Sequence, residues 1–118
     1  MPLAFLCAMA VAIDGDTLRC RGLDRVRLAR IDAPELPGHC RPGRRCAPGD
    51  PFAARAALQQ LLAPPVRCTQ VDALVDTGRA PRRDRYGRIV ARCVSGGRDL
   101  GKVMLARGLA VRWRSKQS

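Results

Sequence analysis

The sequence predicts one small α+β domain, mostly β, in which five short strands form a mixed barrel with two helices packed against it. Three observations support this class. A chain of 118 residues with 47% hydrophobic content can build one core but not two. Short apolar stretches are separated by glycine turns, and two further segments carry the start and stop signals of helices. We therefore expect a single domain over residues 1–118.

The first three strands are predicted as a meander. Residues 3–13 are almost wholly apolar and end at Asp14–Gly15, a common hairpin signal, after which residues 17–21 alternate as a returning strand. A second turn at residues 22–24 leads to residues 25–31, where Val26 and Leu28 mark one face of a third strand.

The middle of the chain predicts a loop followed by a helix. Residues 34–50 are rich in glycine and proline, which favours a loop with a basic tip. Asp50 is suited to cap a helix and Pro51 to its first position, so we expect a helix over residues 51–63 that ends before Pro64–Pro65. Its expected apolar stripe consists of Phe52, Leu58, Leu61 and Leu62.

The last third predicts two strands and a second helix. Residues 66–71 and 88–94 have the composition of strands and are expected to pair in antiparallel fashion. The turn Ser95–Gly96–Gly97 leads to a helix over residues 99–107, with Asp99 near its start and Gly108 as its C-cap.

Six cysteines fall into three local pairs, which favours disulfide bonds. The pairs are Cys7 with Cys20 across the first hairpin, Cys40 with Cys46 in the loop, and Cys68 with Cys93 on the expected antiparallel pair. Zinc is the alternative, but no C-x-x-C occurs and a site with His39, Cys40 and Cys46 lacks a clear fourth ligand. Free thiols with a redox role are a further alternative, which a thiol count would test.

The compartment follows from the state of the cysteines. A disulfide framework indicates a secreted or periplasmic protein, yet the start of the chain has no basic region before its apolar stretch and does not read as a signal peptide. We expect either that a leader was removed or that the protein is cytoplasmic with reduced cysteines. No segment approaches transmembrane length, and we expect a monomer without membrane contact.

The charge balance indicates an anionic partner. The formal net charge is +12, with 22 Lys and Arg residues against 10 acidic ones, and nearly all the basic residues are arginine. A GC-rich genome explains the preference for arginine over lysine but not the excess over the acids. Guanidinium groups match phosphate oxygens, so the charge favours nucleic acid.

Five charged residues beside turns and strand ends suit a metal-assisted attack on phosphate. Asp16 and Asp32 are candidate ligands for a hard cation such as calcium, and Glu35, the only glutamate, could reach a bound water as a base. Arg27 and Arg88 come from different strands and could clamp the phosphate. Taken singly, each of these fragments is more often an ordinary turn or the solvated end of a strand than part of a functional site.

Four motifs in order resemble the thermonuclease family typified by staphylococcal nuclease. They are Ile13-Asp-Gly-Asp-Thr-Leu18, Val26-Arg-Leu-Ala-Arg-Ile-Asp-Ala-Pro-Glu35, Asp84-Arg-Tyr-Gly-Arg88 and Gly108-Leu-Ala110, which span most of the chain. The resemblance implies a five-stranded OB-fold barrel with packed helices, in agreement with the elements expected above.

The resemblance also implies roles for individual residues. Asp16, Asp32 and the backbone carbonyl of Ala33 become calcium ligands, Arg27 and Arg88 the phosphate-binding arginines, and Glu35 the general base, while Arg85 and Tyr86 contact a neighbouring nucleotide. The implied activity is a calcium-dependent hydrolysis of DNA and RNA, single-stranded or locally melted, that leaves 3′-phosphate ends. The alternative is a catalytically silent OB-fold module that binds nucleic acid or a protein partner.

The sequence also departs from the family pattern. Ala33 stands where the type protein has threonine, two cysteines remodel the loop after Glu35, and the C-terminal tyrosines and last helix are not evident. Trp113 could supply stacking on a base instead.

Overall fold

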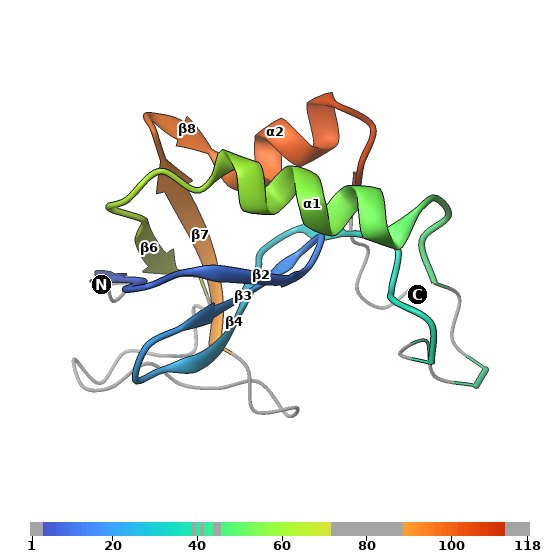
Figure 1. The fold of residues 1–118 in the computed structure, drawn as a ribbon, viewed down its shortest axis with the longest axis horizontal. Helices are drawn as coiled ribbons and strands as arrows, with labels where there is room; N and C mark the ends of the chain where they lie inside the picture. Colours follow the sequence, from blue (N-terminus) through green and yellow to red (C-terminus); the bar gives the residue numbers. More distant parts are fainter. Residues whose placement is uncertain (1–3, 39, 41, 44–45, 72–88, 113–118) are drawn as a thin grey trace.

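The architecture is that of an α+β domain built on one mixed main sheet and a second, two-stranded sheet, as seen in a computed structural model that describes residues 4–38, 40, 42–43, 46–71 and 89–112 (Figure 1). In this part of the chain the strands are β1 (Ala4–Leu6), β2 (Val11–Asp14), β3 (Thr17–Cys20), β4 (Asp24–Leu28), β5 (Ile31–Asp32), β6 (Arg67–Gln70), β7 (Ile89–Ser95), β8 (Arg98–Asp99) and β9 (Val111–Arg112). The helices are α1 (Pro51–Leu61) and α2 (Leu100–Ala106).

The main sheet has the strand order β1-β6-β7-β4-β3-β2, with β8 paired to β7. All neighbours are antiparallel except β4 and β7, which run parallel and pair Val26 with Ile89. The predicted meander of β2, β3 and β4 is confirmed, with Leu18 opposite Val26. Among the described strands the pairing does not close into the expected barrel, although one continuous segment supplies both edges of the sheet.

The expected first strand over residues 3–13 is divided into β1 and β2. The chain turns at Met9, whose φ of 52° lies in the left-handed region that non-glycine residues rarely adopt. Before the turn, β1 pairs with β6 and places Phe5 opposite Cys68; after it, β2 pairs with β3. The prediction of five strands, made from hydrophobicity, therefore merged two edge strands into one.

Helix α1 begins as predicted and ends two residues earlier than expected. The Asp50 carboxylate accepts hydrogen bonds from the backbone N–H groups of Phe52 and Ala53, and Pro51 occupies the first turn. The helix buries Ala54, Leu58 and Leu61, which share one face. The expectation that Phe52 belongs to this face is wrong, because its side chain is 53% exposed.

Helix α2 is short and capped at both ends as expected. The Asp99 side chain accepts a hydrogen bond from the backbone N–H of Lys102. Gly108 follows the last turn with φ of 71°, and its N–H donates to the carbonyl of Leu105, so the helix ends in a left-handed glycine. The helix buries Leu100 and Met104 in the core.

All six cysteines form the three predicted pairs: Cys7–Cys20, Cys40–Cys46 and Cys68–Cys93. Cys68 lies opposite Cys93 in the antiparallel ladder of β6 and β7, as expected. Three disulfides in a chain of this size fit an oxidising setting outside the cytoplasm. No helix in the described part of the chain is long and apolar enough to cross a membrane.

Candidate active site

The candidate site lies where three segments of the chain meet: the β2–β3 turn, the end of β4, and β5 with the residues after it. The backbone N–H of Leu28 donates to the carbonyl of Asp16, at 2.8 Å, which joins the turn to β4. Strand β5 pairs with β9 and sets Asp32 opposite Val111, so the end of the described chain also borders the site. Segments far apart in the sequence are thereby held at one place.

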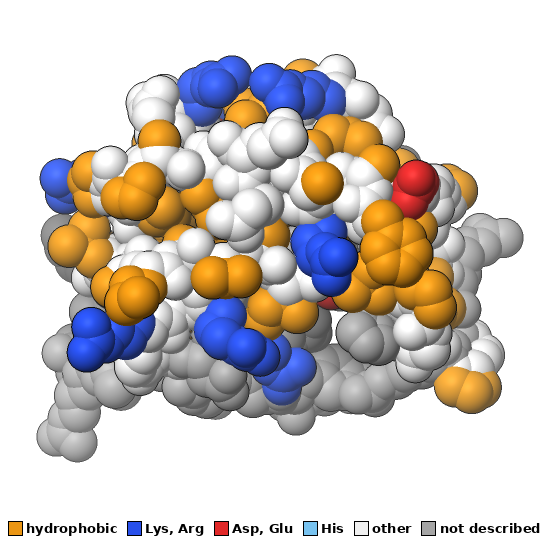
Figure 2. All heavy atoms as spheres, viewed as in Figure 1, with side chains coloured by type: hydrophobic (Ala, Val, Ile, Leu, Met, Phe, Trp, Pro, Cys, Tyr) orange, Lys and Arg blue, Asp and Glu red, His pale blue; other side chains and the backbone are white. Residues whose placement is uncertain are grey.

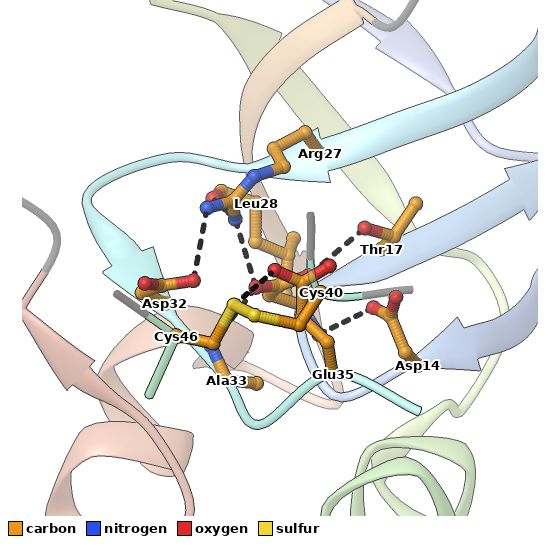
Figure 3. Close-up of polar contacts among 10 residues, drawn as sticks. Asp14, Thr17, Arg27, Leu28, Asp32, Ala33, Glu35, Cys40 and Cys46 are labelled. Carbon is orange, nitrogen blue, oxygen red and sulfur yellow. Dashed lines mark hydrogen bonds and ion pairs between the residues drawn. A yellow bond between two sulfur atoms is a disulfide. The ribbon is translucent and has the colours of Figure 1, made fainter. Parts of the chain in front are cut away.

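The Arg27 guanidinium lies between two carboxylates (Figure 3). Its Nη1 is 3.1 Å from Oδ2 of Asp16, and its Nη2 is 3.6 Å from Oδ1 of Asp32. Nη1 also donates to the carbonyl of Leu28 at 3.2 Å. The three charged side chains are only 8–12% exposed, so one guanidinium contacts two nearly buried carboxylates.

The Asp16 carboxylate is held by further hydrogen bonds. The hydroxyl of Thr17 donates to Oδ1 at 2.9 Å, and the backbone N–H of Ala33 donates to Oδ2 at 2.9 Å. The backbone of Ala33 therefore lies directly beside this carboxylate. Thr17 was not singled out from the sequence, although a hydroxyl next to a site aspartate is a detectable signal for such a contact.

Gly15 allows the close approach on which this arrangement depends. A Cβ atom at this position would lie 2.7 Å from the Cβ of Ala33 and 2.7 Å from the Cβ of Ala54. The turn between β2 and β3 thus packs directly against both the segment after β5 and helix α1. The sequence marked Gly15 as a turn residue, but its requirement here is space rather than backbone conformation, since its φ is not in the left-handed region.

Asp14 lies beside the site, and the pKa of its carboxyl is raised. Burial raises the pKa of its carboxyl from 3.8 to about 7, and the hydrogen bond and negative charge of Asp16 add to the rise. Its Oδ1 also accepts a hydrogen bond from the backbone N–H of Asp16 at 3.2 Å. Asp14 therefore holds a proton in the folded protein under conditions where an exposed aspartate has lost it.

This raised pKa predicts a pH dependence of stability in the calcium-free protein. The folded state binds the Asp14 proton more tightly than the unfolded state, so the contribution of Asp14 to the free energy of unfolding is full below about pH 4 and is lost as pH rises to about 7. We expect Asp14→Asn to remove this decline. Denaturant unfolding at a series of pH values in chelator measures it, with Asp50→Asn as the control; a wild-type minus variant difference that is constant over this range contradicts the prediction.

Glu35 lies two residues beyond Ala33 and contacts the loop disulfide. Its Oε2 is 3.5 Å from Sγ of Cys46, which is bonded to Cys40 and carries no proton, so this is a packing contact rather than a hydrogen bond (Figure 3). Glu35 is half-buried. The disulfide next to this carboxylate was not anticipated as part of the site.

The structure thus brings together four of the predicted site residues through direct contacts: Asp16, Arg27, Asp32 and Ala33. Glu35 adjoins them through the chain. The predictions for Arg85, Tyr86 and Arg88 fall on residues outside those that the structure describes, as does that for His39 as a zinc ligand.

The comparison with protein families matches residues 25–118 to the family described as staphylococcal nuclease homologue. The chain belongs to the staphylococcal nuclease family. The match includes Arg27, Asp32 and Glu35, whereas Asp16 lies before it and contacts Arg27 and Ala33. A search of curated proteins found no match.

Membership in the staphylococcal nuclease family supports an OB-fold core, a nuclease relationship and an affinity for nucleic acid. The surface agrees with an anionic partner. Figure 2 shows Lys and Arg side chains in several separate groups over one face, with far fewer acidic side chains among them. The net charge of +12 attracts a polyanion at long range.

The donor set at the strand ends fits a calcium ion, the metal expected from the sequence. Calcium takes oxygen ligands, and the carboxylates of Asp16 and Asp32 both lie within ion-pair distance of one positive group. Two carboxylates that hold a guanidinium between them create the negative electrostatic potential that a metal ion requires. The backbone of Ala33 is adjacent, and water would complete the coordination.

Proposed function

We propose that this chain is a calcium-dependent, sugar-nonspecific nuclease that hydrolyses the phosphodiester bonds of DNA and RNA and leaves 3′-phosphate ends. The observation that carries the proposal is the Arg27 guanidinium held between the carboxylates of Asp16 and Asp32. A protein that only binds nucleic acid needs positive charge but has no use for buried carboxylates beside its phosphate-binding arginine.

Arg27 would bind the scissile phosphate in this mechanism. Among the described residues, its contacts with Asp16, Leu28 and Asp32 use at most three of the five N–H donors of a guanidinium group. The remaining donors can face a phosphate oxygen, and the charge stabilises the additional negative charge of the transition state. Arg88 is proposed to bind the same phosphate from the opposite side.

Glu35 would act as the general base. Its carboxylate would accept a proton from the attacking water, directly or through a second water, while Asp16, Asp32 and Ala33 would hold the calcium ion. When bound, calcium supplies positive charge to the phosphate and orients the water. Arg85 and Tyr86 are proposed to contact the neighbouring nucleotide, which would favour single-stranded or locally melted substrates.

The same proposal covers the setting and the assembly. The three disulfides support a secreted or periplasmic enzyme, because such bonds form in an oxidising compartment. We propose that it acts as a monomer, since the cluster of Arg27, Asp16 and Asp32 is assembled within one chain.

Asp32→Asn tests the proposal most directly. We expect the wild type to cleave single-stranded DNA in calcium and to stop when chelator is added, because the metal and its carboxylates act together. The variant should lose at least about a hundredfold of the calcium-dependent rate, because one charged ligand is replaced by a neutral amide. Digestion of a labelled oligonucleotide measures the rate, and end labelling identifies the 3′-phosphate.

Asp50→Asn is the matched control, since it removes a carboxylate elsewhere while asparagine still caps helix α1. It should cleave as the wild type does. If the wild type retards the strand on a gel but leaves it intact in calcium, the enzyme proposal is wrong and the silent binding module is the correct function.

A further inference from the structure

The loop between β5 and α1 brings two sulfur atoms and a carboxylate together beside the proposed active site. One ligand atom from each of Glu35, Cys40 and Cys46 lies within 4.8 Å of the other two. In the oxidised protein the two sulfurs are bonded to each other and are poor metal ligands. As thiolates they would form, with the carboxylate, a donor set of the kind that binds zinc.

The loop disulfide is the most accessible of the three. Cys40 is exposed and Cys46 is half-buried, whereas the cysteines of the other two disulfides are at most 3% exposed. A reductant in solution must reach a sulfur atom to exchange with it. Reduction should therefore open Cys40–Cys46 while the two core disulfides remain.

We propose that the reduced loop binds one zinc ion through the thiolates of Cys40 and Cys46 and the carboxylate of Glu35, with water as the fourth ligand. A small dithiol supplies the two electrons. One of its thiolates attacks Cys40 and releases Cys46 as a thiolate; its second thiol then closes a cyclic disulfide and releases Cys40. Zinc binding displaces the remaining thiol protons into solution.

The distances suit a tetrahedral ion. With Zn–S near 2.3 Å and Zn–O near 2.1 Å, the edge between a sulfur and an oxygen ligand is about 3.6 Å. Oε2 of Glu35 is already 3.5 Å from Sγ of Cys46. The Cα atoms of Cys40 and Cys46 are 6.2 Å apart, so the two sulfurs can separate to the tetrahedral edge by side-chain rotation.

The two metal sites differ in chemistry. Asp16 and Asp32 offer hard oxygen ligands, which suit calcium, whereas two thiolates select a softer ion such as zinc. The expected consequence rests on the proposed function: Glu35 cannot accept a proton from water while it ligates zinc. The reduced, zinc-loaded protein should therefore be an inactive nuclease, and reoxidation should restore it.

The experiment compares the oxidised protein with protein treated with a dithiol and then freed of it without air. Thiol titration of the folded, treated protein should find two thiols per chain. Equilibrium dialysis should find about one more zinc per treated chain than per oxidised chain, and cadmium should give thiolate charge-transfer absorbance. Glu35→Gln should weaken zinc binding by at least about tenfold, because loss of a direct ligand costs no less than loss of an outer contact.

A double variant, Cys40→Ser with Cys46→Ser, is the control. It lacks the disulfide and the thiolates, and circular dichroism shows whether it and the treated protein stay folded. Zinc that binds this variant as tightly as the treated wild type, or binds Glu35→Gln undiminished, overturns the proposed site. Titration of six thiols or of none overturns the selective reduction.

Nuclease assays test the proposed zinc site and the proposed nuclease function independently. Zinc should inhibit the treated wild type far more than the oxidised wild type, and the double variant should show only the oxidised protein's sensitivity. If zinc binds as expected but full activity persists, the site stands and the role of Glu35 as base is wrong. If the oxidised protein never cleaves DNA, the proposed function fails while the zinc stoichiometry still decides the site.

Discussion

Arg27→Leu is expected to destabilise the calcium-free protein by about 3–5 kcal/mol at neutral pH. The substitution removes the guanidinium that contacts both Asp16 and Asp32, so two nearly buried carboxylates lose its charge. Calcium should restore part of the loss, because the ion can supply the missing positive charge. Denaturant unfolding in chelator and in calcium measures both effects, and the variant should remain a poor nuclease in either case.

Arg92→Leu provides the matched control for Arg27→Leu. Arg92 also pairs with an aspartate, with its Nε 3.3 Å from Oδ2 of Asp99, but its side chain is 56% exposed. Surface pairs of this kind contribute about 0–1 kcal/mol. If the two variants lose equal stability, or if calcium stabilises Arg27→Leu no more than the wild type, Arg27 and the metal ion do not share the same pair of carboxylates.

Glu35→Gln is expected to lower kcat by about 10²–10⁴-fold with little change in stability. Glutamine keeps the volume and the hydrogen-bonding reach of the side chain but cannot accept the proton of the attacking water. Calcium affinity and retention of DNA on a gel should stay close to those of the wild type, because the metal and phosphate contacts belong to other residues. Rates at saturating substrate and calcium measure the change.

The pH profile distinguishes a base from a structural role. Loss of a general base removes the rise of kcat on the acidic side, whereas a packing defect lowers the rate equally at every pH. A Glu35→Gln variant that cleaves at the wild-type rate, or one that keeps the wild-type profile at a reduced level, contradicts the assignment.

Features set by neighbouring residues were predictable from the sequence. Asp50 and Pro51 define the start of α1 through local hydrogen bonding and a fixed φ, and Asp99 and Gly108 do the same for the ends of α2. The three disulfides join cysteines that are near one another along the chain, so their pairing was also accessible.

Features set by tertiary contacts were not predictable from the sequence. Nothing in the apolar run of residues 3–13 shows that Met9 turns the chain and sends its two halves to opposite edges of the sheet. Hydrophobicity alone placed Phe52 inside, although it lies outside the buried face of α1.

Four of the predicted site residues lie together in the structure, but the contacts among them were not foreseen. The sequence placed Arg27 on the phosphate and Asp16 and Asp32 on the metal. It did not predict that Arg27 would lie between the two carboxylates. It also gave no role to the disulfide against Glu35, because that contact depends on how the loop folds back.

The order of the disulfides along the chain bears on how such a protein is made. Each cysteine is bonded to the next one in the sequence: first to second, third to fourth, fifth to sixth. Six cysteines can be joined in 15 ways. Only this pairing forms if the chain is oxidised while it crosses a membrane from its N-terminus and each free thiol bonds to the next one that emerges. Correct disulfide pairing then needs no rearrangement by an isomerase. Strand β1, in contrast, can pair only once β6, some sixty residues later in the chain, is present.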